Sequence, residues 1–168
     1  MKWDRGLDYE TIYIFLLRKM KNKTLKQRIR CYIQILLIQL RNGSRISEAV
    51  RCYKQFLTTG ERELNIEVSK KKKKETRLMI IPPEIEVDET CYELLHIDDK
   101  KLINRIKTYA SQKLKINTHS LRYAFITYLL RNGVNPAIVS KIIKHSKLDF
   151  ILTYTQEKLA QEILKHLL

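Results

Sequence analysis

The sequence predicts a single, mainly α-helical domain with one small β-hairpin, that is, an α+β fold. Three observations lead to this prediction. The chain has 168 residues, which is enough for one ordinary domain core but not for two. It contains only 4 Gly and 3 Pro, so no segment has the composition of a flexible linker. Apolar residues recur at helical spacing along most of the chain, and they alternate with polar residues only within 62–82.

The N-terminal part of the chain predicts three helices. Asp8 is a suitable N-cap for a helix that runs to about Met20. A second helix is expected over about residues 25–41, where apolar side chains cover almost the whole circumference, so it should be the central buried helix. Asn42-Gly43 predicts the end of this helix, and a short helix should begin near Ile46.

Residues 62–82 form the one segment with the pattern of strands. Apolar residues alternate with polar ones in two runs, at Leu64, Ile66 and Val68 and again at Leu78 and Ile80. Five consecutive lysines, Lys70–Lys74, separate the two runs. This arrangement predicts a β-hairpin with a strongly charged turn.

Helical patterns return after Pro82-Pro83, and the expected helices cover about 88–96, about 99–113, the region from Leu121 to Asn132-Gly133, and the region from Asn135-Pro136 to about Lys144. The tail, residues 155–168, is amphipathic, with Leu159, Ile163 and Leu167 in helical register.

The charge of the chain points to a polyanionic partner. Lys and Arg number 33 against 18 Asp and Glu, which gives a formal net charge of +15 and a sequence pI near 9.8. Counterion release from phosphates drives the association of such a chain with nucleic acid. A lysine-rich proteome is the alternative explanation.

Membranes, secretion and metal binding are not indicated. No apolar run approaches the roughly 18 residues that a membrane span needs, and the N-terminus lacks the features of a signal peptide. We therefore expect a cytoplasmic protein. Cys31, Cys52 and Cys91 are far apart and include no CxxC pair, so they are interpreted as buried or incidental thiols rather than as a disulfide or a zinc site.

Three clusters could perform chemistry on a phosphate. Arg45 follows the break after the central helix, and Glu48 could orient its guanidinium. His119 and Arg122 are three residues apart, which places both on one helical face. Tyr154 follows His145 by nine residues, and a tyrosine needs nearby cations and a base to act as a nucleophile.

The chain carries these features in a fixed order: R-x-S-E, then a lysine hairpin, then H-x-L-R-x-x-F, then a His nine residues before a Tyr. This order resembles that of the tyrosine recombinase (phage integrase) family. The matching stretch, about Leu7–Thr155, corresponds to the catalytic domain of that family. The catalytic residues implied by the resemblance are Arg45, Lys72, His119, Arg122, His145 and Tyr154. The implied DNA contacts are Lys70, Lys71, Lys73, Lys74 and Arg77.

Lys72 is assigned because the family's lysine typically precedes, by five residues, an Arg that opens the next strand, here Arg77. Lys71, Lys73 and Lys74 remain alternatives by a small shift of register. The chain departs from the family at two positions: Lys144 stands where Gly usually precedes the later His, and Ile151 stands where Thr is often found.

The resemblance implies a site-specific recombinase or integrase of phage or mobile-element origin. Such an enzyme cuts and rejoins double-stranded DNA through a 3′-phosphotyrosine intermediate, without a metal or other cofactor. It would be a homo-oligomer, a tetramer, on DNA, with the C-terminal tail docked on a neighbouring protomer, and a monomer in solution is compatible with the same resemblance. About eight residues precede the first expected helix, so we expect no N-terminal core-binding domain.

Two other functions fit parts of the sequence. Leu121 to Lys144 has the proportions of a helix-turn-helix, which would suit a DNA-binding regulator that does not cut. A recombinase-fold fragment acting with or against a full-length integrase is a second alternative. A type IB topoisomerase shares the chemistry but has further domains.

Overall fold

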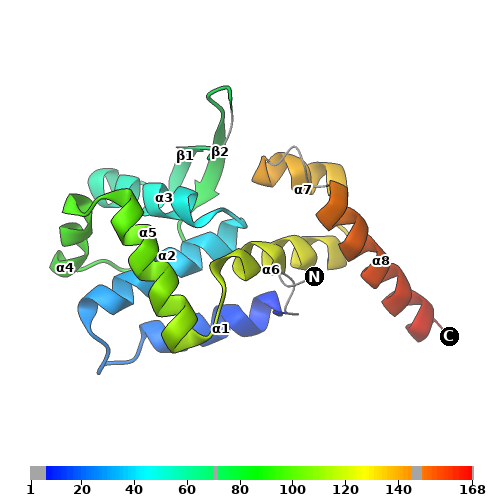
Figure 1. Cartoon of the computed structure of the whole chain (residues 1–168), viewed down its shortest axis with the longest axis horizontal. Helices are drawn as coiled ribbons and strands as arrows, with labels where there is room; N and C mark the ends of the chain where they lie inside the picture. Colours follow the sequence, from blue (N-terminus) through cyan, green and yellow to red (C-terminus); the bar gives the residue numbers. More distant parts are fainter. Residues whose placement is uncertain (1–6, 70–71, 145–148, 168) are drawn as a thin grey trace.

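The computed structural model describes residues 7–69, 72–144 and 149–167, and in the last of these ranges it describes side chains from Gln156 onwards. As predicted, the described part is mainly helical with one two-stranded antiparallel sheet (Figure 1). The elements in chain order are α1 (Tyr9–Met20), α2 (Gln27–Asn42), α3 (Ile46–Thr59), β1 (Glu63–Glu67), β2 (Thr76–Ile80), α4 (Glu89–Tyr92), the 3₁₀ turn η1 (Glu93–His96), α5 (Asp99–Tyr109), the π turn η2 (Ala110–Leu114), α6 (Thr118–Arg131), α7 (Pro136–Ile143) and α8 (Asp149–His166).

Helix α2 is the centre of the core, as its apolar circumference predicts. All residues from Cys31 to Leu40 are buried, including Gln34 and Gln39. Helices α1, α3 and α6 pack against it, so it is covered on several sides (Figure 1). The three cysteines are buried and free, in agreement with their interpretation as core thiols.

Most helix boundaries follow from local capping signals. Asp8 caps α1 by accepting a hydrogen bond from the Thr11 amide, and Gly43 ends α2 in the left-handed conformation, with φ of 58°. Asn135 caps α7, and Pro136 lies in its first turn. The helix expected to be short at Ile46 instead extends to Thr59, because apolar residues continue its buried face as far as Leu57.

The face of β2 that packs inward differs from the predicted one. Leu64 lies opposite Met79 and Ile66 lies opposite Arg77, so Arg77 and Met79 are buried. Leu78, which the alternation predicts on the apolar face, is 54% exposed. The prediction was wrong because Arg77 finds polar partners inside the domain and can be buried there.

The C-terminal helix α8 begins at Asp149, earlier than the tail expected from residue 155, and it extends away from the rest of the described fold (Figure 1). Its described apolar side chains include the exposed Ile163 and Leu164, and the exposed Leu167 follows its last residue. An ion pair between Arg131 and Glu162 connects it to α6. None of the described helices is long and apolar enough to cross a membrane.

Candidate active site

The C-terminal end of α2 holds together the elements that carry the predicted site residues. The Asn42 side-chain amide donates to the carbonyl of Ile80 at 2.8 Å and accepts from the Ile80 amide at 2.8 Å, which fixes β2. Gln39 Nε2 donates to the carbonyls of Ser44 at 3.2 Å and Thr118 at 3.0 Å, which fixes the starts of α3 and α6. Because these donors and acceptors are mostly buried, their hydrogen bonds position three elements around one point.

Gly43 allows α6 to approach this end of α2 closely. A Cβ atom at position 43 would lie 2.1 Å from Cδ1 of Phe125. Phe125 is three residues after Arg122 on α6, and Arg45 is two residues after Gly43. The glycine therefore sets the separation between the two segments that bear the predicted phosphate-binding arginines.

Glu48 is the fully buried carboxylate around which the site is organised. Its Oε2 accepts a hydrogen bond from Arg45 Nη1 at 3.1 Å, as the sequence predicts, and another from the Ser69 amide at 3.1 Å. Its Oε1 accepts from the Arg45 amide at 3.3 Å and pairs with Arg77 Nη1 at 3.9 Å. One carboxylate thus connects α3, the start of the hairpin turn and β2.

Arg122 is a buried cation with unused hydrogen-bond donors. It lies in the first turns of α6, is 3% exposed, and interacts electrostatically with Arg45, Glu48 and Arg77. Within the described part of the chain, neither Nη1 nor Nη2 has a hydrogen-bond partner. Burial, and then the nearby charge of Arg45, lower the pKa of Arg122 to about 10, which leaves the guanidinium charged at neutral pH. Such a group is suited to receive an anion.

Arg77, predicted as a DNA contact, is instead an internal residue. It is 2% exposed, its Nη2 donates to the Asn42 carbonyl, and its Nη1 faces Glu48. Burial lowers its pKa to about 10, and the neighbouring Glu48 carboxylate acts in the opposite direction. Its place therefore makes it a support for the charge cluster rather than a surface contact.

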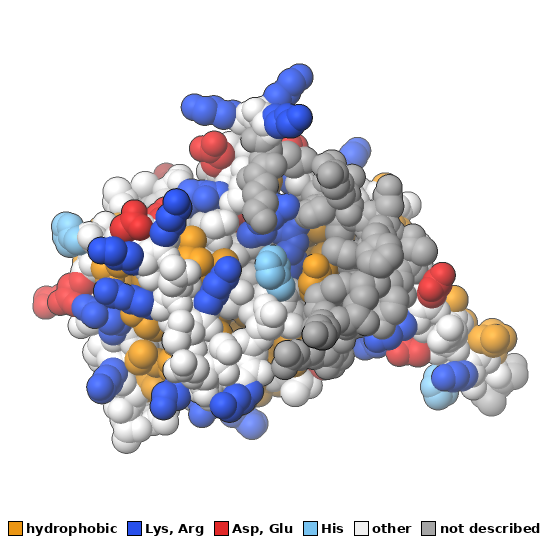
Figure 2. Space-filling view, in the orientation of Figure 1, with side chains coloured by type: hydrophobic (Ala, Val, Ile, Leu, Met, Phe, Trp, Pro, Cys, Tyr) orange, Lys and Arg blue, Asp and Glu red, His pale blue; other side chains and the backbone are white. Residues whose placement is uncertain are grey.

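His119 and the hairpin lysines border this cluster. His119 lies in the first turn of α6, one turn before Arg122, and its amide donates to Asn117 Oδ1 at 2.9 Å. Lys72, Lys73 and Lys74 are exposed in the connection between β1 and β2, and Ser69, at the start of this connection, is anchored to Glu48. Figure 2 shows Lys and Arg side chains at the tip of the hairpin and spread over the face below it.

Four predicted residues lie wholly or partly outside the described part of the chain. Lys70, Lys71 and His145 lie outside the described residues. Tyr154 belongs to α8, but its side chain lies outside the described part. Of the predicted catalytic set, the described structure thus brings together Arg45, Arg122 and His119, with Lys72 on the adjoining hairpin.

Lys144, at the position where the related family usually has Gly, adopts the conformation that glycine favours, with φ of 54°. Its amide donates to the Ser140 carbonyl and ends α7. Its Nζ lies 3.5 Å from Oε1 of Glu75 on the hairpin. The departure from the family pattern therefore keeps the tight turn and adds an ion pair between α7 and the hairpin.

The helix-turn-helix alternative fits the side chains less well. α6 and α7 are joined by a turn at Gly133, as that motif requires. However, α6 is packed into the core, and the exposed side of α7 carries the apolar Ile138 and Ile142. Base edges are read by polar side chains, so this face is poorly suited to reading a major groove.

Sequence reasoning misses the structural roles of Gln39 and Asn42, which fix the elements around the site. It also misses the buried contacts of Glu48 with Ser69 and Arg77. The sequence does carry a signal for Gln39 and Asn42, because both are polar residues within the mostly apolar buried surface of α2. A polar residue in such a stripe has to find a buried partner. The identity of that partner depends on the tertiary fold.

Comparisons with known proteins agree with this arrangement. Residues 92–161 match the Phage integrase family. The chain is 45% identical over 167 residues to ORF241, a predicted integrase of Acidianus two-tailed virus. The alignment covers 98% of this chain and 68% of that protein. It is also 35% identical over 68 residues to the tyrosine recombinase XerC of Pediococcus pentosaceus, covering 39% of this chain and 23% of XerC.

The fold is similar to the crystal structure of XerA recombinase, with a TM-score of 0.52 and 18% identity, over 94% of this chain. The chain spans 64% of the length of XerA. At this identity the likeness concerns the fold alone. Together with the match to ORF241 over almost the whole sequence, these findings show that the chain belongs to the phage integrase (tyrosine recombinase) family, whose members act in DNA recombination.

Proposed function

We propose that this chain cuts and rejoins double-stranded DNA through a covalent 3′-phosphotyrosine intermediate. The observation that carries the proposal is the buried Arg122, whose two terminal nitrogens lack partners within the described structure. A buried cation with unused donors is costly unless an anion completes it. A DNA phosphate provides the charge and the oxygen acceptors that fit a planar guanidinium.

In the proposed reaction, the Tyr154 oxygen attacks the scissile phosphorus. The bond from phosphorus to the 5′-oxygen breaks while the bond to tyrosine forms. His119 takes the tyrosine proton, Lys72 gives a proton to the leaving 5′-oxygen, and His145 assists at the same phosphate. Attack of a 5′-hydroxyl on the phosphotyrosine reverses these steps and rejoins the strand.

Arg45 and Arg122 stabilise the negative charge that develops on the non-bridging oxygens. The ion pair with Glu48 holds Arg45 in place before DNA arrives, so little reorganisation is needed during the reaction. The pKa of Arg122, although lowered to about 10 mainly by burial, keeps its guanidinium protonated at neutral pH. These features support electrostatic catalysis as the main contribution of the site.

The test of this function is covalent trapping on nicked suicide duplexes, followed by denaturing gels. Tyr154→Phe should abolish the adduct and leave noncovalent DNA binding nearly intact, because affinity comes from Lys and Arg side chains. The matched control is Tyr92→Phe, at an exposed tyrosine on α4, which should form the adduct normally. An adduct that persists in Tyr154→Phe would refute the mechanism. DNA binding without any wild-type adduct would favour the non-catalytic alternative.

The assignment of the proton donor has its own test. Alanine substitution at Lys71, Lys72, Lys73 and Lys74 in turn should produce one large rate defect, at Lys72. A 5′-bridging phosphorothiolate has a leaving group that needs no proton, so this substrate should restore the Lys72→Ala rate. Arg122→Ala should stay slow on the same substrate. If no lysine variant recovers, the donor lies elsewhere.

We also propose assembly as a homo-oligomer on DNA. Ile163 and Leu164 are exposed on α8, as is Leu167 just after it, and this helix extends away from the rest of the described fold (Figure 1). Exposed apolar residues on a projecting helix are suited to a groove on a second copy. Ending the chain after Gln156 should remove DNA-bound oligomers and barely change the melting temperature. A large loss of monomer stability with intact assembly would show that the tail serves its own domain.

A further inference from the structure

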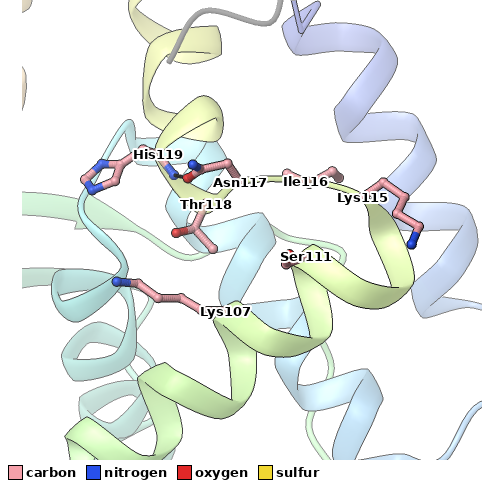
Figure 3. Close-up of a pocket in the computed structure, with 7 residues that line it drawn as sticks. All are labelled: Lys107, Ser111, Lys115, Ile116, Asn117, Thr118 and His119. Carbon is pink, nitrogen blue, oxygen red and sulfur yellow. Dashed lines mark hydrogen bonds between the residues drawn. The ribbon is translucent and has the colours of Figure 1, made fainter. Parts of the chain in front are cut away.

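A pocket of about 440 Å³ lies where α5 turns into α6, beside the candidate active site (Figure 3). Its lining comprises Lys107, Ser111, Lys115, Ile116, Asn117, Thr118 and His119. Two lysines and a histidine thus surround it, and none of the described residues in the lining is acidic. The local potential therefore favours an anion over a cation or a neutral apolar ligand.

The turn that forms this pocket has a defined conformation. The chain leaves α5 through the π turn η2, and Lys115 follows with φ of 58°. The Ile116 amide then donates to the Ala110 carbonyl at 2.9 Å. Ile116 and Thr118 are buried, so the pocket rests on the core.

The cationic side chains are arranged around this floor. Figure 3 shows Lys107 extending on the same side as the His119 ring, whereas Lys115 extends to the opposite side. Ser111, which is exposed, lies between the two lysines. A ligand in the pocket would therefore meet positive charge at both ends and at least one hydroxyl between them.

The position of the pocket relates it to the phosphate expected at Arg122. His119 belongs to the pocket lining and lies one helical turn before Arg122. A DNA strand carries a phosphate at each nucleotide, about 3.4 Å further along the helix axis. A strand that places one phosphate at Arg122 therefore presents its neighbouring phosphates to the adjoining surface, which begins with this pocket.

We propose that this pocket binds the backbone of duplex DNA at a phosphate flanking the scissile one, with Lys107 as its principal cation. The inference rests on the proposed function, because it takes DNA as the substrate. The pocket has room for such a group, since a water molecule takes about 30 Å³ and a phosphodiester with its sugar replaces several waters. Binding here holds the strand in register while the reaction proceeds at the neighbouring phosphate.

The first experiment measures the salt dependence of binding to a fluorescent duplex, with all variants made in the Tyr154→Phe chain. Lys107→Gln should weaken binding and reduce the magnitude of the log–log salt slope by about 0.9, the value for one phosphate contact. Lys101→Gln is the matched control, because Lys101 is exposed on the same helix and does not line the pocket. It should leave the slope unchanged. Equal slopes for both variants would overturn the proposal.

The second experiment fills the pocket and keeps the charge. Ser111→Trp should weaken DNA binding about as much as Lys107→Gln, because the bulky ring excludes the phosphate. Gln112→Trp, at the next exposed residue of η2 and outside the lining, should bind like the parent. If both tryptophan variants bind normally, the lysines act as surface charges and the proposal is wrong. Should Ser111→Trp fail to fold in thermal melts, the lysine comparison still decides.

These outcomes are separable from failure of the proposed function. A wild-type chain that binds no duplex DNA would remove the function itself. A chain that forms the Tyr154 adduct but shows no difference among the pocket variants would remove this inference alone.

Discussion

Gly43→Ala tests whether the close approach of α2 and α6 builds the site. Two costs follow from the structure. The left-handed backbone, with φ of 58°, costs an alanine about 1 kcal/mol. The new Cβ would also lie 2.1 Å from Cδ1 of Phe125 and 2.8 Å from two further ring atoms, so the ring and its helix have to move. Overpacking of this kind costs a further 1–3 kcal/mol, roughly.

Gly60→Ala is the matched control for this prediction. Gly60 also has a positive φ, of 74°, but a Cβ there would have no atom within 4 Å. It should therefore lose only the backbone contribution, about 1 kcal/mol. At this chain length, a loss of about 1 kcal/mol of unfolding free energy lowers the melting temperature by about 2–4 °C. We therefore expect the melting temperature to fall by about 3 °C in Gly60→Ala and by about two to four times as much in Gly43→Ala.

The same pair of variants should differ in activity. Displacement of Phe125 moves the turn of α6 that holds Arg122, away from its place beside Arg45. Covalent adduct formation should therefore fall by at least tenfold in Gly43→Ala, since poor placement by about 1 Å costs up to 100-fold, and stay near wild type in Gly60→Ala. The assays are thermal denaturation and suicide-substrate trapping at a temperature where both variants are folded. Equal losses of stability, or equal activity, would refute the reasoning.

Three further predictions concern charges and caps. Asp8→Ala should cost about 1 kcal/mol by removing the N-cap of α1, whereas Asp8→Asn should retain most of it. Because hydrogen bonds from Thr11 lower the pKa of Asp8 below 3.8, its contribution should be complete above about pH 4 and lost as the pH falls through that lowered pKa, as acid melts can check. Glu48→Gln should lower stability by about 3 kcal/mol, because Arg45 and Arg77 lose their buried counter-charge, and added sulfate should restore part of the melting temperature. Lys144→Gly should relieve about 1 kcal/mol of backbone strain but lose the ion pair with Glu75. Lys115 has a similar φ and forms no ion pair with a described residue, so Lys115→Gly should raise the melting temperature more than Lys144→Gly does.

Local signals in the sequence were sufficient for the helices near the site. Asp8, Asn42-Gly43 and Asn135-Pro136 each specify a boundary through a backbone preference or a short-range hydrogen bond, and the structure confirms all three. The pairing of Arg45 with Glu48 is likewise local, because the two residues are three positions apart. These interactions require no knowledge of the rest of the fold.

The inward face of β2 could not be predicted in the same way. A period of two fixes which residues share a face, but the choice of the buried face depends on what lies behind the strand. Leu78 favours one choice by its hydrophobicity. Arg77 favours burial of the opposite face, because its guanidinium binds Glu48 and the Asn42 carbonyl, which lie 29 and 35 positions earlier in the chain. Only tertiary contacts reveal these partners.

The balance of charge at the site explains why such long-range placement matters. Among the described residues, the guanidiniums of Arg45, Arg77 and Arg122 lie near one buried carboxylate, that of Glu48, which pairs with Arg45 and Arg77 but not with Arg122. Two positive charges therefore remain uncompensated by that group. Burial makes this excess unfavourable for the free protein, as the lowered pKa values of Arg77 and Arg122 indicate. In the proposed reaction, a phosphate with a negative charge would relieve the same excess, and a pentacoordinate transition state with more negative charge would relieve it further. On this proposal, Glu48 holds the cations of the free protein in place, and the remaining positive charge binds the transition state more tightly than the ground state.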